Sequence, residues 1–162
     1  MSVSGGAPPP SPHQLLVEEA AQLRGFLDLL SREQKSLADG DLERLLPLAT
    51  EKNECFTRLS GLGEARGRAL AAAGLAASRQ GMETWLAQQP EAGKIRRDWQ
   101  EFLDLAEQAR ALNETNGKLI ATRLSHNRQA FSTLMSAANQ AALYGPDGQA
   151  RPVGGGRSLG SV

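Results

Sequence analysis

Apolar residues recur at intervals of three and four along most of the chain, a spacing that places them on one face of successive helices. The first stretch begins at Ser11-Pro12, a pair that favours a helix start, and reaches about Ala38. The second begins after Asp39-Gly40-Asp41, where the second aspartate can cap a helix, and ends at Gly74. A connection this short predicts that the two helices run antiparallel.

Two further helical stretches follow. A short one at 75–90 carries Trp85 and is expected to close one end of a bundle. A long one spans 93–142, which corresponds to about 75 Å at the helical rise, against about 36 Å and about 50 Å for the first and second helices. The last helix should therefore extend beyond its partners, and residues after about Leu124 should contribute little to the core.

Composition supports an all-α fold with flexible ends. Aromatic residues make up only 4% of the chain, and the β-branched alternation typical of strands is rare. Residues 1–12 hold four prolines with glycine and serine, and residues 145–162 are rich in glycine, so neither segment can bury enough apolar surface to order itself. We therefore expect an antiparallel helical bundle or hairpin at 13–144, with a long C-terminal helix, between a flexible leader and a flexible tail.

Charge and cysteine content restrict the class of partner and the compartment. Lysine plus arginine and aspartate plus glutamate both number 18, so no net field attracts nucleic acid or an anionic membrane. The chain starts without the basic and apolar segments of a signal peptide, and it holds no apolar run of membrane-spanning length. Cys55 is the single cysteine, which fits a reducing compartment. We expect a soluble cytoplasmic protein.

The sequence offers no arrangement of residues typical of a catalytic or metal site. His13 and His126 lie far apart in sequence, with no cysteine or carboxylate at ligand spacing. Carboxylate pairs such as Glu18 with Glu19 lie among arginines and glutamines, so we expect them on solvated helix faces with ordinary pKa values. The prediction is a protein that is not an enzyme and that holds no metal or cofactor.

The stretch LNETNGKLI, residues 112–120, interrupts the long apolar pattern with Asn113, Asn116 and Gly117. A heptad grid started at Ile95 places both asparagines in the apolar seam, where polar residues fix register and partner choice at some loss of stability. Gly117 costs about 1 kcal/mol against alanine in a helix, but it would let another backbone or a bulky side chain approach closely. Recognition of a partner and a hydrogen bond inside the chain's own bundle explain the asparagines equally well.

Residues 129–146 contain no charged side chain, although every earlier helix is rich in charge. The apolar face of this stretch carries Phe131, Leu134, Met135 and Ala138, and its opposite face has only small or uncharged polar residues. A solvated helix end normally carries charge, so another helix should cover this surface. A partner's helix is the preferred explanation, because methionine adapts to varied surfaces. Self-association and packing along the first helix are the alternatives.

With these features, the chain resembles the FlgN family of flagellar export chaperones over residues 15–149. The specific motifs are the LNETNG stretch and LYGPDGQ at 143–149. The less specific ones are a leucine-rich first helix with Glu33 near its end, GDLERLLPL leading into the second helix, the pair Glu51 and Lys52, and the isolated Trp99.

The resemblance implies a cytoplasmic chaperone that holds the hook–filament junction proteins FlgK and FlgL before secretion and delivers them to the flagellar type III export apparatus. In such chaperones the C-terminal helix binds the client's C-terminal helical segment, which agrees with the uncharged stretch. The candidate docking site for the export gate is Leu143, Tyr144 and Gly145, with the tyrosine as its anchor. The candidate client-binding residues are Asn113, Asn116, Gly117, Ile120, Leu124, Phe131, Leu134, Met135 and Ala138.

Two other classes of protein remain as alternatives. A structural coiled-coil homo-oligomer, such as a homodimer of the free protein, would bury residues 129–142 against a second copy. A mutase-like enzyme built on a helical bundle would instead need arginines and glutamates around an enclosed polar cavity. Exposed apolar surface on the last helix, without such a cavity, would favour the chaperone.

Overall fold

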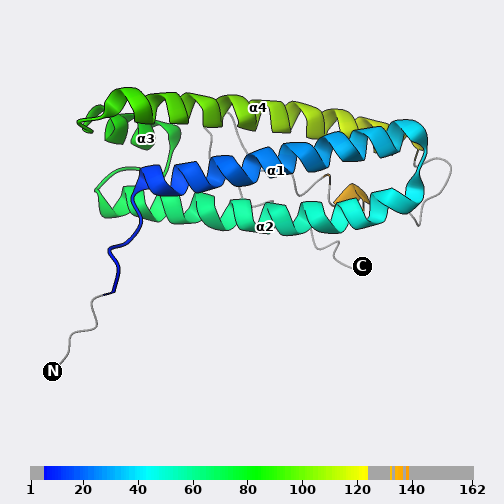
Figure 1. Cartoon of the computed structure of the whole chain (residues 1–162), viewed down its shortest axis with the longest axis horizontal. Helices are drawn as coiled ribbons and strands as arrows, with labels where there is room; N and C mark the ends of the chain where they lie inside the picture. Colours follow the sequence, from blue (N-terminus) through cyan, green and yellow to red (C-terminus); the bar gives the residue numbers. More distant parts are fainter. Residues whose placement is uncertain (1–5, 124–131, 133, 137, 139–162) are drawn as a thin grey trace, which may run out of the picture.

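The computed structural model describes residues 6–123, 132, 134–136 and 138. Within them it contains helices and no strand, which confirms the all-α prediction. Of the four helices in the described residues, the three long ones lie side by side and the short one lies at one end (Figure 1). The helices are α1 (Pro12–Asp39), α2 (Leu42–Ala72), α3 (Arg79–Ala87) and α4 (Ala92–Arg123).

Side-chain caps set the helix starts where the sequence predicts them. Ser11 accepts a hydrogen bond from the backbone N–H of Gln14, whose side chain accepts in return from the N–H of Ser11, so α1 begins with a capping box. Asp41 accepts from the backbone N–H of Arg44 at 3.3 Å and caps α2. Between the two helices, Gly40 adopts a φ of 72°, a left-handed conformation that suits glycine.

The three long helices form an up-down-up arrangement. α1 and α2 are joined by a tight turn and lie antiparallel, as predicted (Figure 1). α4 runs parallel to α1, because His13 contacts Asp98 at 2.7 Å near the starts of these helices and Arg123 donates to the carbonyl of Ala38 near their ends. The short helix α3 makes this orientation possible by bringing the chain to the start of α4 (Figure 1).

α3 joins α2 to α4 through a compact, glycine-dependent connection. Gly81 lies so close to the loop before α3 that an added Cβ would meet the carbonyl oxygen of Ala76 at 1.8 Å, so only glycine fits there. Glu83 on α3 accepts a hydrogen bond from the indole N–H of Trp99 on α4 at 2.8 Å. The predicted role of this stretch, closing one end of the bundle, agrees with these contacts.

The buried face of α4 follows the predicted seam as far as the helix extends. Apolar residues at this seam join those of α1, α2 and α3 in one core, in which Trp99 and Phe102 stack with ring centroids 5.5 Å apart. Burial of this apolar surface is the main force that holds the helices together. The buried residues of α4 are Ile95, Trp99, Phe102, Ala106, Ala109, Asn113, Asn116 and Ile120.

The prediction of a single last helix over 93–142 is wrong. The side-chain amide of Asn113 donates to the backbone carbonyl of Ala138 at 3.0 Å. On one continuous helix these residues would lie about 37 Å apart. α4 ends at Arg123 within the described residues, and Leu134 and Ala138, which are helical, lie back against α4 near Asn113 and Ile120. The hydrogen bond of Asn113 therefore marks a return of the chain that helical periodicity alone does not reveal.

Candidate functional site

Asn116 is an internal residue of the bundle. Its side chain is fully buried, and its Nδ2 donates to the carbonyl of Leu30 at 2.8 Å and to Oε1 of Glu33 at 2.9 Å. Of the two explanations for this asparagine, the structure shows the internal hydrogen bond, made from α4 to α1. Its amide is too deeply buried to meet a partner in this arrangement.

Asn113 faces the returning residues of the chain. It is 6% exposed, and its Nδ2 holds the carbonyl of Ala138, while its Oδ1 has no hydrogen-bond partner among the described residues. A buried amide that is half satisfied is costly, by about 1–3 kcal/mol for the unpaired group. The favourable contribution of Asn113 to the contact between α4 and Ala138 is thus a single neutral hydrogen bond, and its unpaired oxygen opposes that contribution.

Leu134 and Ala138 are buried against the ends of the three long helices. The residues that receive them are Leu37 from α1, Leu45 and Ala49 from α2, and Ile120 from α4, and we call these four residues the platform. Met135 packs against the same cluster and is partly buried. Of the three explanations offered for the uncharged stretch, internal packing describes Leu134 and Ala138 here. The expectation that residues beyond Leu124 contribute little to the core is therefore wrong.

Gly117 lies in α4 with open space beside it. A Cβ added at this position would meet no atom within 4 Å, so the glycine permits no close approach within the described part of the chain. Five predicted site residues lie outside the described residues: Leu124, Phe131, Leu143, Tyr144 and Gly145.

Two ion pairs inside the bundle are a feature that the sequence reasoning missed. Arg66 of α2 donates from Nε to Oε2 of Glu19 at 2.7 Å, and Lys52 donates to both carboxylate oxygens of Glu33 at 3.1 and 3.2 Å. All four side chains are at most 1% exposed. The expectation that Glu19 lies on a solvated face is wrong. Its position within the leucine stripe of α1 was the available signal.

Burial changes the titration of two groups near this charged core. Burial lowers the pKa of Lys52 from its ordinary value, and the charge and hydrogen bonds of Glu33 oppose the shift only in part. Burial likewise raises the pKa of the Cys55 thiol, an effect that the nearby Arg58 opposes. Both shifts reflect the cost of a charge in the bundle interior.

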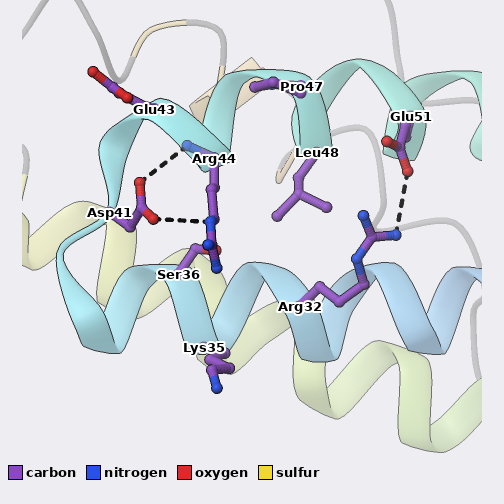
Figure 2. A pocket seen from close by; sticks show the side chains of 9 residues that line it. All are labelled: Arg32, Lys35, Ser36, Asp41, Glu43, Arg44, Pro47, Leu48 and Glu51. Carbon is purple, nitrogen blue, oxygen red and sulfur yellow. Dashed lines mark hydrogen bonds and ion pairs between the residues drawn. The ribbon is translucent and has the colours of Figure 1, made fainter.

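An open pocket with a volume of about 630 Å³ lies beside the turn between α1 and α2 (Figure 2). Four of its charged residues form two ion pairs, since Arg44 contacts Asp41 at 3.0 Å and Arg32 contacts Glu51 at 3.4 Å. Leu48 lies between these two pairs in Figure 2. The arrangement is that of surface ion pairs around an apolar side chain, and it provides no pair of groups poised for acid–base chemistry.

Metal sites and membrane-spanning helices are two further features that a helical protein can carry. Among the described residues, no three histidine, cysteine, aspartate or glutamate side chains gather closely enough to hold a metal ion. None of the helices in this part of the chain has both the length and the apolar character needed to cross a membrane. The candidate functional surface is the contact of Leu134, Met135 and Ala138 with the platform, because it joins the uncharged stretch to an apolar cluster.

The family profile and the relatives that match this chain all carry the same family name. A profile of the family described as FlgN protein matches residues 10–152. A flagella synthesis protein FlgN from Proteus mirabilis is 28% identical over 149 residues, which cover 90% of this chain and 94% of the relative. A flagella synthesis protein FlgN from Yersinia enterocolitica is 45% identical over 53 residues, and that match spans 33% of this chain and about a third, 35%, of the relative.

A solved structure shares the fold. The crystal structure of a candidate flagella synthesis protein FlgN from Pseudomonas aeruginosa has a TM-score of 0.64 to this chain at 22% identity, and the likeness covers 83% of this chain and 99% of the other. The family profile extends over the four helices, the platform, and Leu134 and Ala138, which pack on it. Since it matches far more than half of the sequence, the chain belongs to the FlgN family.

Proposed function

We propose that this protein is a cytoplasmic export chaperone that binds the hook–filament junction proteins FlgK and FlgL and delivers them to the flagellar type III export apparatus. Membership of the FlgN family supports the proposal, as does the flagella synthesis protein FlgN from Proteus mirabilis, which this chain matches along nearly its whole length. The function requires a surface that can bind a helical segment of a client.

The contact of Leu134, Met135 and Ala138 with the platform carries the proposal. It shows that a helical, uncharged segment can be held by Leu37, Leu45, Ala49 and Ile120 through a small apolar interface. A buried leucine is worth about 1.5–3 kcal/mol, and one neutral hydrogen bond about 0.5–1.5 kcal/mol. Interactions of this size are weak enough for a client helix to compete with them.

In this proposal, Leu134, Met135 and Ala138 bind the client, together with residues of the same uncharged stretch such as Phe131. In the free protein Leu134 and Ala138 pack on the platform, so these residues must leave it before they can bind a client. The client then receives an apolar helical face that is rich in small residues, which favours close helix packing. Leu143, Tyr144 and Gly145 follow this stretch and are the proposed contact with the export gate.

The substitution Asn113→Ala tests this order of events. It removes the hydrogen bond to Ala138 without altering the proposed client-binding side chains of Leu134, Met135 and Ala138. Loss of one neutral bond should strengthen client binding about 2- to 10-fold, because the segment leaves the platform more easily. Isothermal titration of purified FlgK and FlgL into both proteins measures the effect.

The matched control is Thr115→Ala, which lies in the same helical turn and loses only a local bond to the carbonyl of Ala111. Its affinity for both clients should equal that of the wild type. No binding of either client by the wild-type protein would refute the chaperone proposal. Weaker binding by Asn113→Ala would instead make Asn113 a direct client contact.

A further inference from the structure

The core of the bundle contains charged layers at a regular spacing. Glu19 pairs with Arg66, and fourteen residues further along α1, Glu33 pairs with Lys52, which precedes Arg66 by the same fourteen residues. Residues of a helix in a bundle return to the same side every seven residues, one heptad, so residues fourteen apart lie two heptads apart on the same side. Both pairs therefore obey a single antiparallel register of α1 against α2.

An apolar layer lies midway between the two charged layers. Seven residues after Glu19 comes Phe26, and seven residues before Arg66 comes Leu59, and both belong to the same buried core. The order along the hairpin is thus charged, apolar, charged. The remaining positions of the α1 stripe are leucines at seven-residue spacing, namely Leu16, Leu23, Leu30 and Leu37.

α4 repeats the same order. The guanidinium of Arg66 lies 5.2 Å from the ring centroid of Phe102, and fourteen residues later Asn116 donates to Glu33 at 2.9 Å. Ala109, midway between them, is buried in the apolar core. The two charged layers therefore each extend across all three helices. The first ends on an aromatic face that attracts the cation, and the second on an amide that donates to the carboxylate.

A leucine stripe at heptad spacing does not by itself distinguish the observed alignment of α1 and α2 from one that is shifted by a heptad. In one direction such a shift would set Glu19 opposite Leu59 and Lys52 opposite Phe26. In the other it would set Arg66 opposite Phe26 and Glu33 opposite Leu59. Either shift leaves the buried charges opposite apolar side chains, a strongly unfavourable state.

We propose that the two buried ion pairs, with Asn116 and Phe102, form a register code that selects one alignment of α1, α2 and α4. Buried ion pairs add little stability over well-packed apolar residues, so their value here lies in the alignments that they exclude. The ion pairs also disfavour the replacement of α1 by an apolar helix, because such a helix would leave Arg66 and Lys52 buried without carboxylates. The platform consists of apolar side chains alone, so an apolar helix can be exchanged there without leaving a buried charge unpaired.

Crosslinking of introduced cysteines tests the code. In a Cys55→Ala background, Arg32→Cys with Glu51→Cys joins positions that form an ion pair across α1 and α2 in the observed register. Arg32→Cys with Arg58→Cys, or with Arg44→Cys, reports a shift by one heptad, because these positions are displaced by about 10 Å along the helix in the observed register. All four reporter positions are exposed or half-exposed, and dibromobimane, a short thiol crosslinker, is the probe.

The fourfold variant Glu19→Leu, Arg66→Met, Glu33→Leu and Lys52→Met removes both charges from each layer. It should keep or raise the thermal midpoint of unfolding, yet crosslink both the native and the shifted pairs. The control exchanges one pair, as Glu33→Lys with Lys52→Glu, and should crosslink only the native pair, since Asn116 can accept from a lysine through Oδ1.

Two results would overturn the proposal. If the fourfold variant crosslinks the native pair alone, the turn at Gly40 and the apolar packing suffice to set the register. If the fourfold variant shows no cooperative unfolding transition, the ion pairs are needed for folding itself and not for the choice between alignments. The proposal does not depend on the identity of any client, so it can fail or succeed independently of the chaperone function.

Discussion

Leu134→Asp gives the most direct test of the contact between the platform and the returning segment. Leu134 is 1% exposed and packs with Leu37, Leu45, Ala49 and Ile120. A carboxylate at this site would be buried without a counter-charge, at a cost of several kcal/mol. The segment avoids this cost by leaving the platform, so the free energy of unfolding falls only by the amount that docking contributes.

That amount can be worked out from the contacts. The leucine contributes about 1.5–3 kcal/mol through burial, and the bond from Asn113 to the carbonyl of Ala138 about 0.5–1.5 kcal/mol. We expect Leu134→Asp to lower the free energy of unfolding by about 2–4 kcal/mol, the sum of these two terms.

Urea unfolding followed by circular dichroism measures this loss. The matched control is Ser136→Asp, which adds the same charge two residues away at an exposed position, and it should change the free energy of unfolding by less than about 0.5 kcal/mol. Equal effects of the two substitutions would refute the burial of Leu134 on the platform. A loss by Leu134→Asp well above about 5 kcal/mol would show that the segment cannot detach and is a fixed part of the core.

Three further outcomes are expected. Gly117→Ala should raise the free energy of unfolding by about 0.5–1 kcal/mol in urea titrations, because a Cβ meets open space there, and a loss of stability would contradict this geometry. The pKa of Lys52 is lowered in the folded protein, so between that pKa and 10.5 the unfolded chain binds more protons than the folded chain. The free energy of unfolding should therefore rise with pH in this alkaline window, relative to that of the double variant Glu33→Leu with Lys52→Met. A flat or falling difference in urea titrations would contradict this expectation. Cys55, buried and with a raised pKa, should react with Ellman's reagent at pH 8 at least about 10-fold more slowly in the native protein than in guanidinium, and equal rates would mean that the thiol is exposed.

Local sequence signals determined the helices themselves. Ser11 with Pro12 and Asp41 after Gly40 mark helix starts through capping groups within three residues, so no distant contact is needed to identify them. The seam from Ile95 to Ile120 could also be predicted, because a helix fixes which residues share a face. Membership of the family was indicated by motifs that are continuous in the sequence.

Tertiary structure decided the partners of the polar seam residues. From the sequence alone, Glu19 resembles a surface carboxylate. In the structure, α2 places Arg66, 47 residues away in the sequence, against it. Asn116 finds Glu33 only because α4 lies parallel to α1, an orientation that depends on the path of the chain through α3. The return of Ala138 to Asn113 was likewise hidden, since a helical period continues to fit a sequence whether the helix runs on or folds back. Periodicity determines which face of a helix is apolar, whereas the contact that covers this face depends on residues far away in the chain.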